Sequence, residues 1–145
     1  DSRVYLQRDD GQSQNGWRCI TRDHNLLNQL VDDNAEAEGR TTDFSEYNKQ
    51  GMATSLYTIT DYLTIDSDEI SNPMPSYDRQ ILQVKAGNCL VVCSDGVHDL
   101  VSCEEWSTID EQTELQDWLK NLRKQIYVSQ GRAYDNVTVI VIRFC

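Results

Sequence analysis

The sequence predicts an α+β fold built on antiparallel strands. Strand-like segments follow one another closely near the amino terminus, which favours hairpin pairing. Two later runs, 89–93 and 137–144, are continuously apolar, as is typical of strands buried on both faces. Apolar residues at helical spacing lie between these groups of strands. With 145 residues the chain has the size of one domain, which we expect to span 1–145.

The first elements are expected to be a hairpin and a helix. Val4–Leu6 forms a short strand, residues 10–11 (Asp-Gly) a turn, and Trp17–Thr21 the returning strand. Asp23 is placed to cap a helix. The apolar stripe of that helix consists of Leu26, Leu27, Leu30 and Val31.

Residues 32–78 are expected to form a variable, flap-like excursion. The sequence turns polar and loses periodicity over 32–55, and both prolines of the chain lie in 66–78. Residues 56–65 alternate loosely and are a strand candidate.

Regular structure is expected to resume after residue 79. Residues 81–84 read as a strand, and the turn at 86–88 leads into the apolar run 89–93. Ser102 and Glu105 form a capping box for a short helix. A longer helix precedes Gly131, and its apolar face is Leu115, Trp118, Leu119, Leu122 and Ile126. The run 137–144 is the last strand.

Charge and hydropathy exclude several kinds of partner. Twenty-four acidic residues against 13 basic ones give a net charge of −11. Nucleic acid requires a basic surface, and so does an anionic membrane, so we expect neither as a partner. No apolar run approaches the roughly 18 to 20 residues that cross a bilayer. The five cysteines include no C-x-x-C pair, which favours free thiols in a reducing compartment, the cytoplasm.

Two aspartates flank the apolar runs and point to a cation site. Asp95 follows the run 89–93, and Asp135 precedes the run 137–144. If these strands pair antiparallel, both carboxylates emerge at one edge of the sheet. Asp1 stands before the first strand, and Asp99 lies one helical turn beyond Asp95. Oxygen ligands without histidine or thiolate select hard cations such as magnesium, manganese or calcium.

The same residues have an ordinary structural interpretation. Asp-Gly is a common turn pair, and Asp-Asn before a strand is common in loops. The pairing of the two strands is itself an expectation. Spacing alone therefore indicates a divalent-cation site without establishing one.

Four segments resemble, in order, motifs of the protein phosphatase 2C family of metal-dependent serine/threonine phosphatases. Residues 1–6 (DSRVYL) resemble its Gly-Asp-Ser-Arg strand without the glycine, and 20–24 (ITRDH) resemble its Leu-Thr-x-Asp-His segment. Residues 86–99 (AGNCLVVCSDGVHD) resemble G-D-x-L-L-L-C-S-D-G-L-x-D, and 135–141 (DNVTVIV) resemble the terminal D-N-[IV]-T-V motif.

The resemblance implies a fold, a cofactor and residue roles. The fold would be an antiparallel β-sandwich flanked by helices, of which this chain supplies the later part. Asp95 and Asp135 match ligands of a central pair of Mn²⁺ or Mg²⁺ ions, and Asp1 and Asp99 match carboxylates that hold a third ion in several members. Asn136 and Gly96 would lie behind the ligands, with Ser94 and Gly96 shaping the turn. The ions would activate a bridging water against phosphorus, so no protein nucleophile is needed.

The sequence also departs from the family pattern. The upstream Asp-Gly-x-Gly-Gly motif, the early acids and the phosphate-binding arginine are absent. Because the chain begins at Asp1 beside a strand, we expect it to have been cut from something longer and to be inactive or weak alone. The excursion 32–78 matches a flap beside the site in the family. The resemblance implies that this flap determines the substrate preference. Its sequence is unlike the family's and therefore predicts no particular substrate.

Both histidines have structural interpretations that compete with functional ones. His24 falls in the first turn of a helix, where packing or surface exposure is the expectation. His98 lies between Asp95 and Asp99 and is a candidate proton shuttle, although a solvent-facing loop residue is the favoured interpretation.

Three functions compete on the sequence alone. The leading one is a phosphatase for phosphoserine and phosphothreonine in proteins, opposing a serine/threonine kinase pathway. The second is a catalytically silent regulatory or scaffold relative, which the weak family match over 51–59 favours slightly. The third, a calcium-dependent binding module, lacks any EF-hand spacing.

Overall fold

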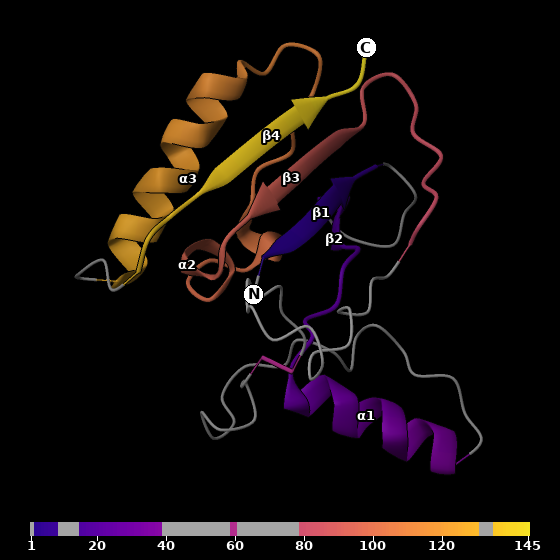
Figure 1. Cartoon of the computed structure of the whole chain (residues 1–145). Coiled ribbons are helices and arrows are strands. Elements are labelled where there is room, and N and C mark those ends of the chain that lie inside the picture. Colours follow the sequence, from indigo (N-terminus) through magenta and orange to yellow (C-terminus); the bar gives the residue numbers. More distant parts are fainter. Residues whose placement is uncertain (1, 9–14, 39–58, 61–78, 131–134) are drawn as a thin grey trace, which may run out of the picture. The chain divides into compact units, whose positions relative to one another are not determined.

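The computed structural model describes residues 2–8, 15–38, 59–60, 79–130 and 135–145 (Figure 1). The chain divides into two compact units, one of Asp1–Thr21 with Gln83–Cys145 and one of Arg22–Leu82. In the described part of the chain, no helix combines the length and the apolar character needed to cross a membrane.

The first unit is built on a four-stranded antiparallel sheet with the order β2-β1-β3-β4 (Figure 1). These strands are β1 (Arg3–Gln7), β2 (Trp17–Cys19), β3 (Cys89–Cys93) and β4 (Val139–Arg143). The central strand β3 pairs with β1 on one side and with β4 on the other. The predicted α+β class with antiparallel pairing is confirmed.

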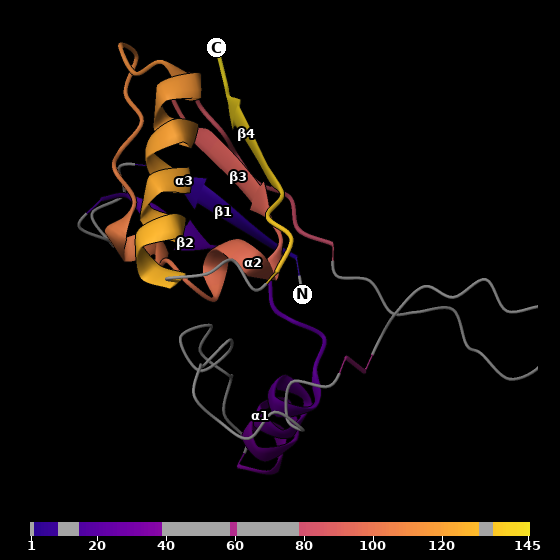
Figure 2. The same ribbon diagram turned by 90° about the vertical axis from the view of Figure 1, so that its left-hand side faces the viewer.

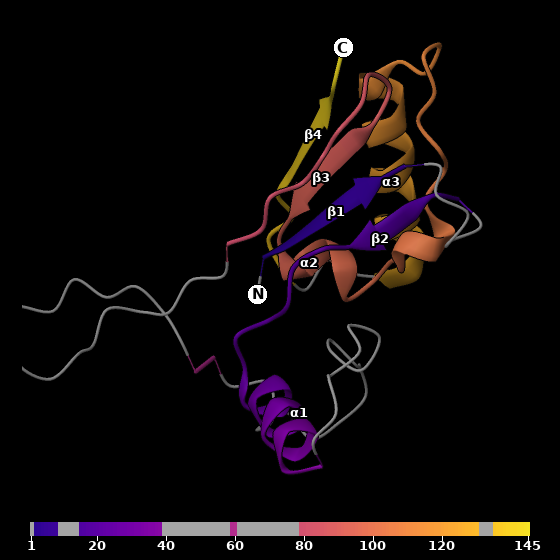
Figure 3. The ribbon, with the colours of Figure 1, turned by 90° about the vertical axis from the view of Figure 1, so that its right-hand side faces the viewer.

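Helix α3 (Leu115–Gln130) covers one face of this sheet, as the side views in Figures 2 and 3 show. Trp118, Leu122 and Ile126 recur every four residues, so one side of the helix is apolar along its length and is buried. The sheet contributes the side chains of alternate residues to the same core. These are Tyr5, Trp17, Cys89, Val91 and Cys93, with Val139 and Val141 at the margin.

The opposite face of the sheet is less covered, which corrects the expectation that the apolar runs are buried on both faces. In β3 buried and half-buried residues alternate, and in β4 the side chains of Ile140 and Ile142 are 55% and 44% exposed. Successive side chains of a strand point to opposite faces, so only every second one reaches α3. The strand β4 also begins at Val139, later than the predicted start.

An aromatic cluster closes the end of the core near β2. The ring centroids of Trp17 and Trp106 lie 5.5 Å apart, and those of Tyr5 and Trp106 lie 4.7 Å apart. Trp17 and Trp118 both donate from Nε1 to the carbonyl of Ser107, at 3.0 and 2.9 Å. Two of the three buried indoles thus find an acceptor inside the core, whereas Nε1 of Trp106 is buried without a hydrogen bond to any of the described residues.

The predicted capping box at Ser102 forms only in part. Residues Cys103–Glu105 make a 3-10 turn (η3), and the Ser102 hydroxyl accepts the N–H of Glu104. The carbonyls at the end of this turn are bound by a distant residue. The side-chain amide of Asn15 donates to the carbonyls of Cys103 and Trp106, at 2.7 and 2.9 Å.

In the second unit, α1 (Leu26–Ala37) differs from the prediction at both ends. Its N-cap is Asn25 and not Asp23, because the Asn25 side chain accepts the N–H of Asn28 at 2.9 Å. Asp23 instead offers its carbonyl to the Asn28 side chain. The helix also runs past residue 32, where loss of structure was expected. Its polar second half contains Ala35, which is 2% exposed and therefore packed.

The predicted strand 81–84 is wrong. These residues are irregular, and the side chain of Ile81 is 82% exposed. Both edges of the neighbouring β3 are already paired with β1 and β4, which leaves no partner there for another strand. The turn that follows forms as expected, with Gly87 at φ 86°. The candidate strand 56–65 lies almost entirely outside the described residues, although Ile59 forms a bridge with Asn25.

Candidate metal site

The two motifs that carry Asp95 and Asp135 meet at one edge of the sheet. The last pair of the β3–β4 ladder is Cys93 with Val139. Beyond it, the N–H of Ser94 donates to the carbonyl of Thr138 at 3.1 Å. The carboxyl end of β3 and the amino end of β4 therefore lie side by side, as the sequence predicts.

The hydroxyl of Ser94 joins the two motifs a second time. Its Oγ donates to the carbonyl of Asn136 and accepts the N–H of Thr138, both at 3.1 Å. These bonds link residues more than 40 positions apart, and they fix the chain leading from Asp135 into β4. The sequence predicts only that Ser94 shapes the turn, and these contacts add a role in joining the two motifs.

Gly96 brings the two backbones into direct contact. A Cβ at this position would lie 2.5 Å from the carbonyl oxygen of Asn136 and 3.2 Å from its carbonyl carbon. No side chain fits at that distance, so the requirement for glycine is steric. The backbones of the two aspartate motifs touch here.

The carboxylates of Asp95 and Asp135 each accept one backbone N–H. Their second oxygens are available to bind a cation. Asp95 begins the short helix α2 (Asp95–His98), and its Oδ1 accepts the N–H of Gly96 at 2.9 Å. Oδ1 of the exposed Asp135 accepts the N–H of Asn136 at 2.7 Å. Among the residues described, no basic side chain forms an ion pair with either aspartate. Two unneutralised acids at one edge favour a bound cation.

Asp99 is the C-cap of α2, one turn beyond Asp95, as predicted. Its N–H donates to the carbonyl of Asp95 at 3.0 Å, and its own Oδ1 lies 3.0 Å from Nδ1 of His98. The expectation that His98 faces solvent is wrong, because the residue is only 5% exposed. It is the last residue of the short helix α2 and is buried there beside Gly96 and Val97.

Three of the four predicted ligands, Asp95, Asp99 and Asp135, belong to the described part of the chain. Asp1 lies outside the described residues. Within 2–8, 15–38, 59–60, 79–130 and 135–145, no three acidic, histidine or cysteine side chains are grouped closely enough to hold a metal ion. The donors at this edge are carboxylate oxygens, which fit Mn²⁺ or Mg²⁺ in kind. They fall short in number, and further ligands are needed to complete a cage.

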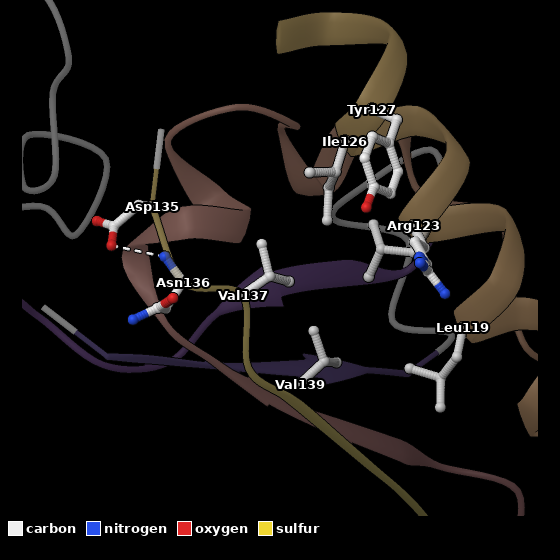
Figure 4. A pocket seen from close by; sticks show the side chains of 9 residues that line it. Leu119, Arg123, Ile126, Tyr127, Asp135, Asn136, Val137 and Val139 are labelled. Carbon is white, nitrogen blue, oxygen red and sulfur yellow. Dashed lines mark hydrogen bonds between the residues drawn. The ribbon is translucent and has the colours of Figure 1, made fainter. Parts of the chain in front are cut away.

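A pocket of 360 Å³ adjoins this edge, and no pattern in the sequence predicts it. Leu119, Leu122 and Ile126 of α3 form one wall, and Val137 and Val139 form the other (Figure 4). The rim is polar and consists of Arg123, Tyr127, Asp135 and Asn136. Figure 4 shows the Asp135 carboxylate pointing away from the helix side chains.

Solved structures of serine/threonine phosphatases share this fold. The S. agalactiae serine/threonine phosphatase is 26% identical, with a TM-score of 0.66 over 99% of this chain and 51% of its own. The catalytic domain of PstP, solved with two manganese ions, is 27% identical, with a TM-score of 0.54 over 97% and 49%. The PPM phosphatase MsPP of Mycobacterium smegmatis, solved with cacodylate, supports the fold alone at 21% identity, with a TM-score of 0.64 over 100% and 53%.

The chain therefore has the fold of part of a PPM-type serine/threonine phosphatase, and it spans about half the length of these structures. No protein-family model matches the chain, and no curated protein sequence matches it either.

Proposed function

We propose that this chain is the later part of a metal-dependent phosphatase that removes phosphate from phosphoserine and phosphothreonine in proteins. Its substrates would be the products of serine/threonine kinases. The observation that carries the proposal is the contact between the two aspartate motifs, in which Gly96 admits the carbonyl of Asn136. That contact brings the backbones on which Asp95 and Asp135 stand together.

Each residue at the edge has a distinct role in this proposal. Asp95 and Asp135 hold Mn²⁺ or Mg²⁺, and Asp99 with Asp1 contributes to a further ion. When bound, such ions supply a water of lowered pKa and neutralise charge on the phosphate. Asn136 fixes the Asp135 carboxylate through its N–H, at 2.7 Å. The Ser94 hydroxyl joins the end of β3 to the segment that leads into β4, and it is not a nucleophile.

Activity requires ligands beyond those described here. The chain spans about half of the phosphatases that it resembles in structure, and the family's early metal-binding motifs are absent from its sequence. We propose that these motifs lie upstream or in a second chain. The half-exposed sheet face around Ile140 and Ile142 is the apolar surface against which that part would pack. Coexpression of the two parts should then give phosphopeptide hydrolysis with Mn²⁺.

Metal binding by the chain itself tests the proposal. Mn²⁺ is paramagnetic, so titration followed by NMR should broaden the amide signals of 94–99 and 135–138 first. Asp95→Asn and Asp135→Asn should each weaken this effect at least tenfold. Asp117→Asn is the matched control, because Asp117 is an exposed acid on α3 that pairs with Lys120 at 2.7 Å. Broadening spread over the surface acids, and unchanged in both site variants, would sink the proposal.

One observation favours a second candidate, a silent scaffold with the same fold. The described residues hold no group of three metal donors. A scaffold need not bind Mn²⁺ at all, so the same titration separates the two functions. Site-specific broadening that is lost in Asp95→Asn counts for the enzyme.

A further inference from the structure

The pocket between α3 and the start of β4, here named the α3–β4 pocket, has the properties of a binding site. Its 360 Å³ lies at the lower end of the roughly 300–1,000 Å³ typical of ligand pockets. That volume admits a large side chain or a small ligand. The walls are aliphatic, and polar groups lie only at the rim (Figure 4).

The pocket combines polar groups with aliphatic side chains, several of which are partly exposed, and this requires an explanation. Tyr127 at its rim is 58% exposed and Val137 in its wall is 43% exposed, and the adjacent Val128 is 85% exposed. Protein interiors seldom leave voids larger than a water molecule. An accessible apolar hollow bordered by polar groups is characteristic of a surface that binds something.

Its position relates the pocket to the chemistry. Asp135 belongs both to the pocket rim and to the proposed metal site, and its carboxylate turns away from α3 (Figure 4). A phosphate held by ions at that carboxylate would lie at the rim of the pocket, on the side that faces away from α3. An extended peptide advances about 3.3–3.6 Å per residue, so a side chain two to four residues from the phosphorylated one would reach it.

We propose that the α3–β4 pocket receives a bulky apolar side chain of the phosphoprotein substrate, located within about four residues of the phosphorylated serine or threonine. The assignment rests on the proposed function and adds a substrate preference to it. The apolar walls supply affinity for the side chain, and the shared Asp135 segment sets its spacing from the phosphate.

The charge at the rim refines the expected sequence. The guanidinium of Arg123 lies 5.4 Å from the ring centroid of Tyr127, and Lys124 is its exposed neighbour on α3. In a chain with a net charge of −11, this is a local concentration of positive charge. This positive charge would pair with an acidic residue beside the bulky apolar residue of the substrate. It would also attract negatively charged phosphopeptides to this edge of the sheet.

Peptide binding to the chain followed by methyl NMR tests the assignment. The probes are phosphoserine peptides in which phenylalanine replaces alanine at one position at a time, from four residues before to four after the phosphoserine. With Mn²⁺ present, phenylalanine at one position should tighten binding about tenfold or more. It should also shift the methyl signals of Leu119 and Val139, a readout that needs no variant.

Two substitutions, one just before β4 and one within it, provide a matched pair. Val137→Phe fills the pocket and should abolish the gain from phenylalanine. Ile140→Phe enlarges a residue of similar exposure, 55% against 43%, on the other face of the sheet, and should retain the gain. Arg123→Met keeps the apolar stem and should lower the preference for a neighbouring acidic residue severalfold.

The failures of the two proposals are distinguishable. If binding depends on phosphate and Mn²⁺ but no phenylalanine position matters, the pocket assignment is overturned and the phosphatase proposal stands. If phenylalanine tightens binding equally without phosphate and without Mn²⁺, the peptide does not bind as a substrate. The proposed function then fails, and the substrate assignment fails with it.

Discussion

The carbonyl oxygen of Asn136 occupies the space into which a side chain at Gly96 would extend. A Cβ on residue 96 would lie 2.5 Å from that oxygen and 3.5 Å from a methyl carbon of Val137. Gly96 follows Asp95 and Asn136 follows Asp135, so the contact sets how closely the two carboxylates approach. The geometry of the candidate metal site thus depends on the absence of a side chain.

Gly96→Ala should separate the two motifs. The added methyl group must displace the Asn136 backbone, and overpacking of this kind costs about 1–3 kcal/mol. Because Asp135 moves with Asn136, the variant should also weaken Mn²⁺ binding. Urea unfolding and the Mn²⁺ titration measure the two effects.

Gly87→Ala is the control for that variant. Gly87 has φ 86°, and a Cβ there would meet nothing within 4 Å. Alanine should cost about 1–2 kcal/mol through backbone strain alone and leave Mn²⁺ binding unchanged. Equal Mn²⁺ affinity in the two variants would show that the Gly96 contact does not position the ligands.

Ser94→Ala should loosen the junction of β3 and β4. The variant loses the bonds of the hydroxyl to the Asn136 carbonyl and from the Thr138 N–H. We expect a loss of about 1–2 kcal/mol in the free energy of unfolding and faster hydrogen exchange at the Thr138 amide. Ser129→Ala, at an exposed position on α3, should be neutral or slightly stabilising. Unchanged exchange at Thr138 would contradict the fastening role.

The sequence predicts the site's edge because strand pairing follows from local patterns. The runs that end at Cys93 and begin near Val139 are short, apolar and bounded by turn residues. Antiparallel pairing of such strands necessarily brings Asp95 and Asp135 to one edge. The helix α3 was predictable for the same reason, since its apolar residues recur at helical spacing.

The features that the sequence missed depend on contacts between distant residues. Residues 81–84 have a strand-like composition but no free strand edge beside β3 to pair with. The α3–β4 pocket exists only where the side chains of α3 and β4 fail to meet, which no local pattern records. His98 is likewise buried because α2 packs against the rest of the unit. The residues beside His98 in the sequence do not indicate this burial.

Asn15→Ala should destabilise the aromatic cluster, although Asn15 is not a member of it, because Asn15 bonds the backbone of two of its tryptophans. The Asn15 amide donates to the carbonyls of Cys103, Glu104 and Trp106, and its Oδ1 accepts the N–H of Trp17. Loss of these bonds removes a donor from the half-buried carbonyls of Cys103 and Trp106, although the Cys103 carbonyl keeps the N–H of Trp106. We expect a cost of about 2–3 kcal/mol. Near-ultraviolet circular dichroism of the tryptophans and urea unfolding measure the effect. Asn121→Ala, exposed on α3, should change neither, and a similarly small effect at Asn15 would refute its capping role.

Stability should fall at alkaline pH because the thiol of Cys93 is buried in the core and that of Cys103 is half-buried at its margin. Burial, with the Cys19 thiolate adding to it, raises the pKa of Cys93 to about 12 and that of Cys103 to about 11, from 9.0. Burial also raises the pKa of Tyr5. The folded state then binds more protons than the unfolded state above pH 9. The stabilisation is complete below pH 9 and is lost as pH rises from 9 toward 12.

Urea unfolding from pH 8 to 11, under reducing conditions, should therefore show a free energy of unfolding that declines above pH 9. Cys103→Ala removes one of the responsible groups and should make the decline shallower. Cys145→Ala, at an exposed position, should leave the slope as it is. A free energy that stays level over this range would mean that the thiols ionise as readily in the folded chain as in the unfolded one, and that the core at Cys93 and Cys103 is open to water.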